Sequence, residues 1–391
     1  MIHLPKRNTS SSFIFYIFAM TRFIEIHLIQ NFAPSCLNRD DTGAPKDAMF
    51  GGYRRSRISS QCLKRAIRQT FSSAGLLTTE ELGIRTRNIV SLLEEKLSEK
   101  GITESRTAIE QALSILELKL KEPKKKGKDE ASKQPQTEYL LFLSNNAIAE
   151  LADVIETHLN ALTEGKSGRE LKKAIEDCVS SASAVDVALF GRMLADRKEL
   201  NVDAAAQVAH AISTHRVDRE SDFFTAVDDW TRDDQADAGM LGTVEFNSSC
   251  QYRYAVVNLD QLQLNLGGDA VLAQRGLLAF LQASIHAIPT GKQNTFAAHN
   301  LPSFVGITVR SGQPVSLANA FEVPVKAGDH KRGLAAASVV KLQEHCQQLS
   351  KAYGLELNLS VMDLTDAWDG TRKEDLVGLL ASIEDLVGSG S

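Results

Sequence analysis

The chain has 391 residues, and its 44 basic and 49 acidic side chains give a formal net charge of −5 at pH 7. A hydrophobic fraction of 43% and a charged fraction of 24% are typical of a globular protein with a full core, which excludes a disordered or fibrous chain. At about 150 residues per domain, this length predicts two or three structural units. Five scattered cysteines with no C-x-x-C pair argue against a disulfide framework or a structural zinc site and indicate a reducing compartment. Because no segment approaches the ~18 apolar residues of a membrane span, we expect a cytoplasmic protein with no membrane partner.

The first residues do not fit the pattern of a folded element. Lys6-Arg7 and the apolar run from Phe13 to Ala19 faintly resemble a signal peptide, but the run is short and no cleavage site follows. We therefore predict that residues 1–19 are an upstream extension. A strand pattern begins directly afterwards, from Phe23 to Ile29, with the inward side chains Ile24, Ile26 and Leu28.

The stretch from Ala48 to Thr79 contains no acidic residue, although the whole chain is net acidic. It holds six basic side chains, namely Arg54, Arg55, Arg57, Lys64, Arg65 and Arg68. A local inversion of charge of this kind suggests a surface for an anion, most often a nucleic-acid backbone. A solvated basic helix on an ordinary surface is the alternative, because basic clusters are a nonspecific signal.

The spacing within this stretch predicts a strand followed by a helix. Tyr53 to Ile58 alternates like a short strand, which places Arg55 and Arg57 on one face. Ser59 or Ser60 is the expected N-cap of the helix. The helix would turn Leu63 and Ile67 inward, and its polar face would carry Gln61, Lys64 and Arg68. Free N–H groups at a helix start beside a basic stripe are suited to phosphate.

The next part of the chain is mainly helical. Helical periodicity runs from about Thr79 to Leu120 and resumes over 147–159 and 169–179. The segment from Lys121 to Glu138 is polar and reads as a solvated linker. We therefore expect a helical insertion over residues 72–182 in a chain that opens with a strand.

Strand-like sequence returns after the helical block, at 185–190, weakly at 207–217 and strongly at 241–259. Between them lies a polar, acidic arm that carries Phe223, Phe224 and Trp230. On a hairpin or protruding loop these aromatics would lie outside the core and could stack on bases. The alternative is a small satellite cluster in which Phe223 and Phe224 fold back.

The C-terminal third predicts a helix over 271–288, a strand over 304–309 and helices over 335–349 and 373–387. Strands and helices alternate irregularly, which favours an α+β fold over a doubly wound one. The sequence contains no phosphate loop, dinucleotide fingerprint or nucleophile elbow. The dispersed histidines make poor metal pairs. No group of residues in the sequence has the pattern of an active site, and we expect no cofactor and no metal.

Long ordered motifs add a resemblance to a known family. The N-terminal ones are Pro34-Ser35-Cys36-Leu37-Asn38-Arg39-Asp40-Asp41, Lys46-Asp47-Ala48, Phe50-Gly51-Gly52, Arg54-Arg55 and Arg57-Ile58-Ser59-Ser60-Gln61. Later ones include Val185-Asp186, Gly191-Arg192-Met193, Ala209-His210-Ala211-Ile212, Phe224-Thr225-Ala226-Val227-Asp228-Asp229, Tyr252-Arg253-Tyr254-Ala255, Leu266-Gly267-Gly268 and Leu317-Ala318-Asn319-Ala320-Phe321-Glu322. Together they resemble the type I-E CRISPR Cascade backbone subunits, the CasC family of the RAMP superfamily, over roughly residues 20–330. The extension and the lysine-rich linker lie outside the likeness.

The resemblance implies a fold shaped like a hand. Its palm would be a modified RNA-recognition-type (RRM-like, ferredoxin-like) sheet built from residues 20–71, 183–206 and 247–391, the last part including the C-terminal helices. Residues 72–182 would form helical fingers and 207–246 a protruding β-hairpin thumb. Copies of such a subunit stack along one CRISPR RNA beside other Cascade subunits, displace bases at regular intervals and leave the guide free to pair with target DNA in antiviral defence. The family role is noncatalytic.

The resemblance also implies roles for individual residues. The RNA backbone would be held by Lys46, Ser59, Gln61, Lys64 and Arg68, with Arg39, Arg55 and Arg57 as weaker additions. Met193 would act as an apolar wedge beside the guide, and Phe223 and Phe224 would lie near the displaced base.

Two other functions remain open on the sequence. Related RNA-recognition-type proteins cleave CRISPR RNA with histidine and tyrosine, and His27 and Tyr53 are the candidates nearest the basic cluster. The chain would then be a CRISPR RNA-processing endoribonuclease. A helical adaptor without an RNA role is the third possibility.

Overall fold

A computed structural model describes residues 21–121, 135–180, 184–194, 197–226, 240–326, 328 and 331–388. The predicted extension, most of the lysine-rich linker and Trp230 lie outside these residues. None of the described helices is long and apolar enough to cross a membrane.

Among the described residues, nine strands form one antiparallel sheet. Along its main path they lie in the order β13 (Ser360–Asp363), β12 (Phe304–Ser311), β1 (Arg22–Ser35), β11 (Met240–Asn258), β9 (Ala211–Ser213), β3 (Tyr53–Ile58) and β2 (Asp47–Phe50). The strands β8 (Ala206–Val208) and β10 (Glu220–Ala226) also pair with β11. Helices accompany a sheet in which the described strand pairs are all antiparallel, and this confirms the predicted α+β class.

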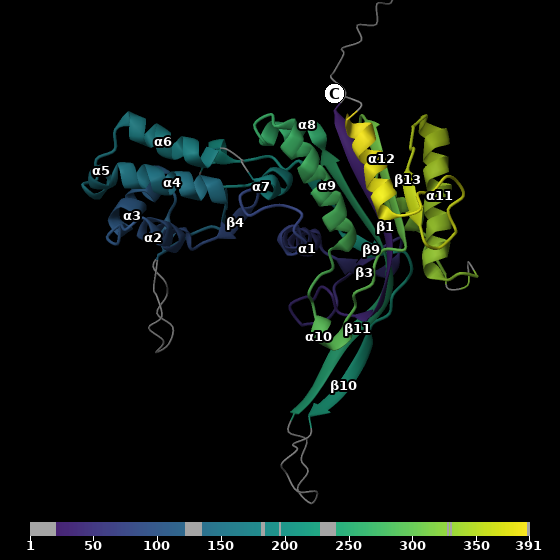
Figure 1. Cartoon of the computed structure of the whole chain (residues 1–391). Helices are drawn as coiled ribbons and strands as arrows, with labels where there is room; N and C mark the ends of the chain where they lie inside the picture. Colours follow the sequence, from purple (N-terminus) through teal and green to yellow (C-terminus); the bar gives the residue numbers. More distant parts are fainter. Residues whose placement is uncertain are drawn as a thin grey trace, which may run out of the picture.

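The strand β1 lies between β11 and β12 and is buried on both faces. Ile26, for example, is opposite Ala255 of β11 and Ile307 of β12. One face carries the predicted inward residues Ile24, Ile26 and Leu28, which is confirmed by their burial. It packs against α1 (Ser60–Ser73), α7 (Val185–Phe190), α8 (Leu259–Asn265), α9 (Ala270–His286) and α12 (Leu376–Gly388) (Figure 1).

The second face of the sheet is covered by α11 (Leu334–Tyr353) and the short 3-10 helix η3 (Ala318–Phe321). The apolar side chains Ile29, Tyr252 and Phe304 pack there. Glu25 and His27 alternate with Ile24 and Ile26 and therefore point to this second face, where they are also almost fully buried. The simple alternation in the sequence therefore understates how completely this strand is covered.

A mainly helical unit with a core of its own extends to one side of the sheet (Figure 1). Its helices are α2 (Ile89–Glu99), α3 (Arg106–Ile115), α4 (Asn145–Thr157), α5 (Leu159–Thr163) and α6 (Arg169–Ser180). It also holds two short strand pairs, β4 (Gly83–Thr86) with β7 (Leu141–Ser144) and β5 (Leu120–Lys121) with β6 (Gln136–Thr137). The described residues also form the short helices η1 (Lys198–Leu200) and α10 (Gln293–Phe296).

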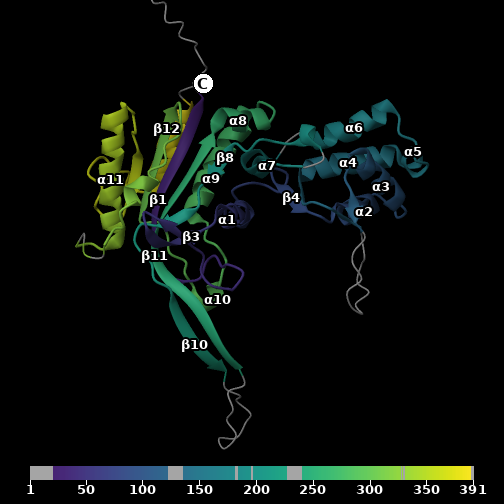
Figure 2. The same ribbon diagram turned by 180° about the vertical axis from the view of Figure 1, so that it is seen from behind.

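The strands β10 and β11 form a hairpin that projects away from the sheet, as Figure 2 shows from behind. Their pairing runs from Glu220 opposite Phe246 to Ala226 opposite Met240. The predicted thumb boundary at 207 is therefore wrong. The segments β8 and β9 pair with β11, and β9 with β3, inside the large sheet. The projecting arm begins near Glu220.

One predicted element has the wrong type. The segment Val185–Phe190 was expected to be a strand, and it is the helix α7. Five of its six residues are buried, so its sequence shows no polar stripe. A short apolar run buried on every side cannot be assigned to strand or helix from periodicity alone.

Candidate nucleic-acid interface

A groove of about 920 Å³ lies beside α1, between the sheet and the helical unit. Helix α1 lines it with Gln61, Lys64, Arg65 and Arg68, and Met193 lines it from the segment after α7. The structure thus brings together four of the residues that the resemblance nominates. Of the described residues that line the groove, Asp203 alone is acidic, so its wall is strongly basic. Such a wall is suited to a polyanion.

Helix α1 begins as the sequence predicts. Ser59 is the N-cap, with extended backbone angles (φ −70°, ψ 148°) and a hydroxyl that accepts from the Cys62 N–H at 3.4 Å. Its own N–H donates to Asn38 Oδ1 at 2.8 Å, which ties the helix start to the loop after β1. Leu63 and Ile67 are buried, as expected for the inward face. Because the Ser59 side chain is buried, its main observed role is to cap the helix.

Lys64 is half-buried in the groove, and Gln61 is exposed one turn earlier. The Lys64 ammonium lies 5.7 Å from the centroid of the Phe190 ring. Partial burial lowers the pKa of Lys64 below its ordinary value of 10.5, because the charged form loses hydration. The charge is therefore held at the wall of the groove with reduced screening, where a phosphate would restore favourable electrostatics.

Arg68 has a partner that the sequence did not reveal. Its guanidinium forms an ion pair with Asp186 of α7 at 3.0 Å and donates to the Gly83 carbonyl at 3.2 Å. It also lies 4.4 Å from the centroid of the Phe142 ring. Asp186 is almost fully buried, and desolvation raises the pKa of its carboxyl, while Arg68 lowers it. Arg68 therefore joins α1 to the helical unit, in addition to facing the groove.

The structure does not support Arg55, one of the weaker predicted RNA contacts, in that role. Its side chain is fully buried, and its guanidinium donates to the carbonyl oxygens of Ser213, Phe321 and Glu322 at 3.0, 2.7 and 3.1 Å. A buried cation surrounded by backbone acceptors cannot reach an external phosphate. It instead ties β3 to β9 and η3, and burial lowers the pKa of Arg55.

A second basic cluster lies at the start of α1 and comprises Lys46, Arg57 and His210. Arg57 Nε donates to the Asp47 carbonyl at 3.1 Å, and its Nη1 lies 3.2 Å from His210 Nδ1. Burial and the neighbouring Arg57 and Lys46 lower the pKa of His210. Arg39 is exposed in the same loop as Lys46, within which it bridges to Pro45. Sequence reasoning missed His210 as part of this cluster, although it lay within one of the quoted motifs.

Met193 is 84% exposed, although it is an apolar side chain at the edge of a folded segment. The preceding turn is fixed by Gly191, whose φ is +77° and where an added Cβ would lie 2.8 Å from the Val202 carbonyl. The thioether is thus presented on a constrained turn to the groove that α1 lines. An exposed apolar side chain in a basic groove is suited to contact a base rather than a phosphate.

Phe223 and Phe224 lie on β10, with exposed fractions of 64% and 39%. They do not form the buried satellite cluster that was the alternative. The ring of Phe224 lies across Gly242 of β11, where an added Cβ would be 2.4 Å from Phe224 Cζ. Glycine at 242 therefore makes room for this ring.

The family model described as CT1975-like protein matches residues 24–388. The chain belongs to this family. No curated protein matches it. Among solved structures it is similar to a chain of a "CRISPR RNA-guided surveillance complex, pre-nicking", with 32% identity and a TM-score of 0.79 over 93% of this chain and 100% of that one. A chain of another "CRISPR RNA-guided surveillance complex" matches with 28% identity and a TM-score of 0.69 over 93% and 99%. The predicted resemblance to the type I-E CasC family is confirmed at this level.

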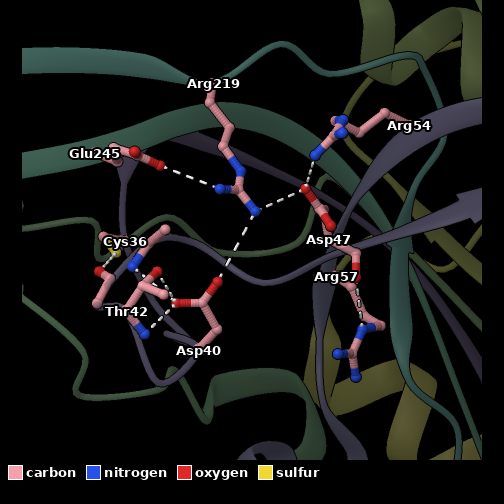
Figure 3. A network of polar contacts seen from close by, with 10 residues as sticks. Cys36, Asp40, Thr42, Asp47, Arg54, Arg57, Arg219 and Glu245 are labelled. Carbon is pink, nitrogen blue, oxygen red and sulfur yellow. Dashed lines mark hydrogen bonds and ion pairs between the residues drawn. The ribbon is translucent and has the colours of Figure 1, made fainter.

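The base of the hairpin of this CT1975-like chain carries a network of charges (Figure 3). Arg219, next to β10, contacts Asp47 of β2 at 2.8 Å and Glu245 of β11 at 3.2 Å, and lies 3.9 Å from Asp40. Arg54 of β3 also pairs with Asp47. The N-terminal segment that carries Asp40 and Asp47 therefore meets Glu245 of the hairpin on one guanidinium.

The residues considered for RNA cleavage are poorly placed for it. His27 is 2% exposed, its Nδ1 lies 2.9 Å from the Tyr252 hydroxyl, and burial lowers its pKa to about 3. It is therefore neutral at physiological pH and closed off from a substrate, whereas Tyr53 is on the surface at the start of β3. Among the described residues, no group of three or more His, Cys, Asp or Glu side chains could hold a metal ion.

Proposed function

We propose that this chain is a noncatalytic backbone subunit that binds CRISPR RNA in a type I-E Cascade surveillance complex. The observation that carries the proposal is the basic groove, in which the Lys64 face of α1 lies with the exposed Met193. This groove belongs to a chain that matches a surveillance-complex subunit along that subunit's full length.

In this proposal the RNA backbone follows the polar face of α1. Gln61 and Lys64 contact phosphates in the groove, and Lys46 and Arg57 contact them at the helix start. Each neutralised phosphate releases counterions, so binding weakens as salt rises. Arg68 contributes charge at the groove while it remains paired with Asp186.

The apolar groups act on the bases. Met193 inserts beside the guide, and the hairpin places Phe223 and Phe224 against a displaced nucleotide. Copies of the chain stack head to tail along one RNA, because a heterologous contact repeated by the same rotation builds a filament. The exposed guide bases then pair with target DNA, so that base pairing reads sequence and the protein reads backbone and shape.

The architecture supports the same assignment. The antiparallel sheet with β1 near its centre serves as the palm, which we infer to be a modified RRM-like sheet. The helical unit serves as fingers, and the β10–β11 hairpin as thumb. A noncatalytic role is supported by the burial of His27, which removes the histidine on which the nuclease hypothesis depends.

The test is to express the full chain with a CRISPR array and the neighbouring Cascade proteins, purify it and extract nucleic acid. RNA of one uniform length in a large particle is the expected result. Recovery of the chain as an RNA-free monomer, with the partners present in the lysate, would overturn the proposal.

A further inference from the structure

The charge network at the hairpin base is more than a surface ion pair. Arg219 has three carboxylates around it, contributed by the loop after β1, by β2 and by β11. Its side chain is 31% exposed, and those of Asp40, Asp47 and Glu245 are 29%, 26% and 38% exposed, so solvent screens the network only in part. A single exposed pair contributes little, but partly buried charges that share one guanidinium hold a fixed geometry.

The position of Arg219 in the hairpin register matters. Ser221 is opposite Glu245 and Phe223 opposite Thr243. Since side chains alternate between the faces of a strand, Arg219, Glu245 and Phe223 belong to the same face of the hairpin. The network is therefore attached to the face that carries the more exposed aromatic residue.

At its other end, the network reaches the loop that carries Arg39 and Lys46. Asp40 Oδ1 organises this loop by accepting from the Thr42 N–H at 3.0 Å, the Thr42 hydroxyl at 2.7 Å and the Ala44 N–H at 3.0 Å. Its Oδ2 lies toward Arg219. Asp47 directly follows Lys46 and also contacts Arg54. One guanidinium thus touches both the aromatic hairpin and the basic loop (Figure 3).

We infer that Arg219 is a positioning residue that fixes the inclination of the hairpin relative to the loop of Lys46. It thereby sets where Phe223 meets an RNA whose backbone the loop holds. The orientation itself is a property of the protein, and its consequence for RNA rests on the function proposed above. Removal of Arg219 frees the hairpin to tilt about its base, because Asp40 and Glu245 lose their shared cation while Asp47 keeps its pair with Arg54.

The first experiment measures the orientation without RNA. Spin labels at Asp222→Cys on β10 and Tyr353→Cys at the end of α11 report the inclination by pulsed dipolar spectroscopy. The full chain carries Cys62→Ser, because the other four cysteines are buried. The wild-type background should give one narrow distance peak. We expect that peak to broaden or split in Arg219→Gln and to recover in part in Arg219→Lys, which keeps one charge but not the planar fork.

The matched control is Arg216→Gln. Arg216 lies three residues before Arg219 and pairs with Asp218 at 2.9 Å. It should leave the distance peak unchanged. An Arg219→Gln peak as narrow as that of the control would overturn the inference, whether or not the chain binds RNA.

The second experiment measures the consequence for RNA. In the assembled particle, bases that the hairpin displaces should react with chemical probes at regular intervals. Arg219→Gln should retain RNA but lower the contrast between displaced and stacked bases by about fivefold, the low end of ordinary coupling between sites. Unchanged contrast would overturn the link to the guide. An RNA-free wild-type particle would overturn the proposed function instead, while the spectroscopic comparison still decides the role of Arg219.

Discussion

Arg68 of α1 and Asp186 of α7 form an ion pair of 3.0 Å, and Arg68 also donates to the carbonyl of Gly83 in the helical unit. Asp186 also accepts from the Gly83 N–H at 2.7 Å, so a single buried carboxylate holds two elements together. Substitution of Arg68 is consequently a poor test of RNA binding, because a loss of RNA would follow from damage to the fold as well.

Arg68→Met should destabilise the protein by about 3 kcal/mol, because it leaves a buried carboxylate unpaired. The effect should depend on pH. Desolvation already raises the pKa of Asp186 above 3.8, and the charge of Arg68 opposes this shift. Without Arg68 the pKa of Asp186 should therefore be higher still. At a pH above this raised pKa, the Asp186 carboxylate of the variant is fully charged and unpaired. As the pH falls below that pKa, the carboxyl takes up a proton, and the loss of stability caused by the substitution becomes smaller. The difference in Tm from wild type should therefore be larger at pH 8 than at pH 5.

The control for this measurement is Lys96→Met, which removes an exposed pair with Glu99. Exposed pairs of this kind contribute about 0–1 kcal/mol, so the control should shift Tm little at either pH. An Arg68→Met deficit that is equal at pH 5 and pH 8 would contradict the role assigned to the buried carboxylate.

Lys64→Glu isolates the RNA interaction from the fold. Lys64 is half-buried at the groove wall, and reversing its charge should repel the RNA backbone while the packing of Leu63 and Ile67 remains. The measurement uses a second, neutral variant, Lys64→Gln, in titrations of the purified chain with guide RNA. This variant should lower the slope of log K against log salt concentration by about 1 for each bound copy. Lys341→Gln on α11 removes the same charge from the opposite face of the sheet and should keep the wild-type slope. Equal slopes for the two variants would contradict the assignment of the groove as the surface that binds the RNA backbone.

Arg55→Met should act on stability rather than on RNA contacts. It leaves the carbonyl oxygens of Ser213, Phe321 and Glu322 without their donor. Each buried acceptor left unsatisfied costs about 1–3 kcal/mol, so we expect a loss of about 3 kcal/mol or more in the free energy of unfolding. Arg372→Met, at an exposed pair with Asp366, is the control for loss of an arginine. Chemical denaturation measures both, and a near-wild-type midpoint for Arg55→Met would refute the structural role.

Gly242→Ala tests the aromatic face of the hairpin without removing an aromatic residue. An added Cβ would lie 2.4 Å from Phe224 Cζ, so the flexible ring must move while the strand pairing stays. We expect the probe reactivity of displaced bases to change at unchanged RNA content. The double variant Phe223→Ala with Phe224→Ala, which removes both rings, should change it in the same direction. In a Phe224→Ala background the added methyl group meets no ring, so Gly242→Ala should then have no further effect. Additive effects of the two substitutions would show that Gly242 acts by another route.

The basic helix was predictable because its signals are local. A serine cap, two inward apolar residues and a polar stripe lie within ten residues of one another, and Ser59, Leu63 and Lys64 lie as the helical spacing requires. The grouping of Met193 with that helix came only from the family resemblance, since the two are brought together by the fold.

The errors concern residues whose environment is set by distant segments. Arg55 resembled an exposed cation because its acceptors at 213, 321 and 322 are far away in sequence. Arg219 passed unnoticed because Asp40 and Asp47 precede it by more than 170 residues. The helix α7 was mistaken for a strand because burial on all sides removes the period that distinguishes the two.

The 19-residue strand β11 is continuous from the hairpin into the middle of the sheet. The same strand pairs with β10 in the hairpin and with β1 from Phe32 opposite Ser249 to Phe23 opposite Asn258. A force that pulls the hairpin along this strand therefore acts parallel to β1. It strains many of the hydrogen bonds between β1 and β11 at once and does not open them one after another. The arm should therefore resist a load along β11, whereas its tilt about the base is limited by the contacts of Arg219 with Asp47 and Glu245.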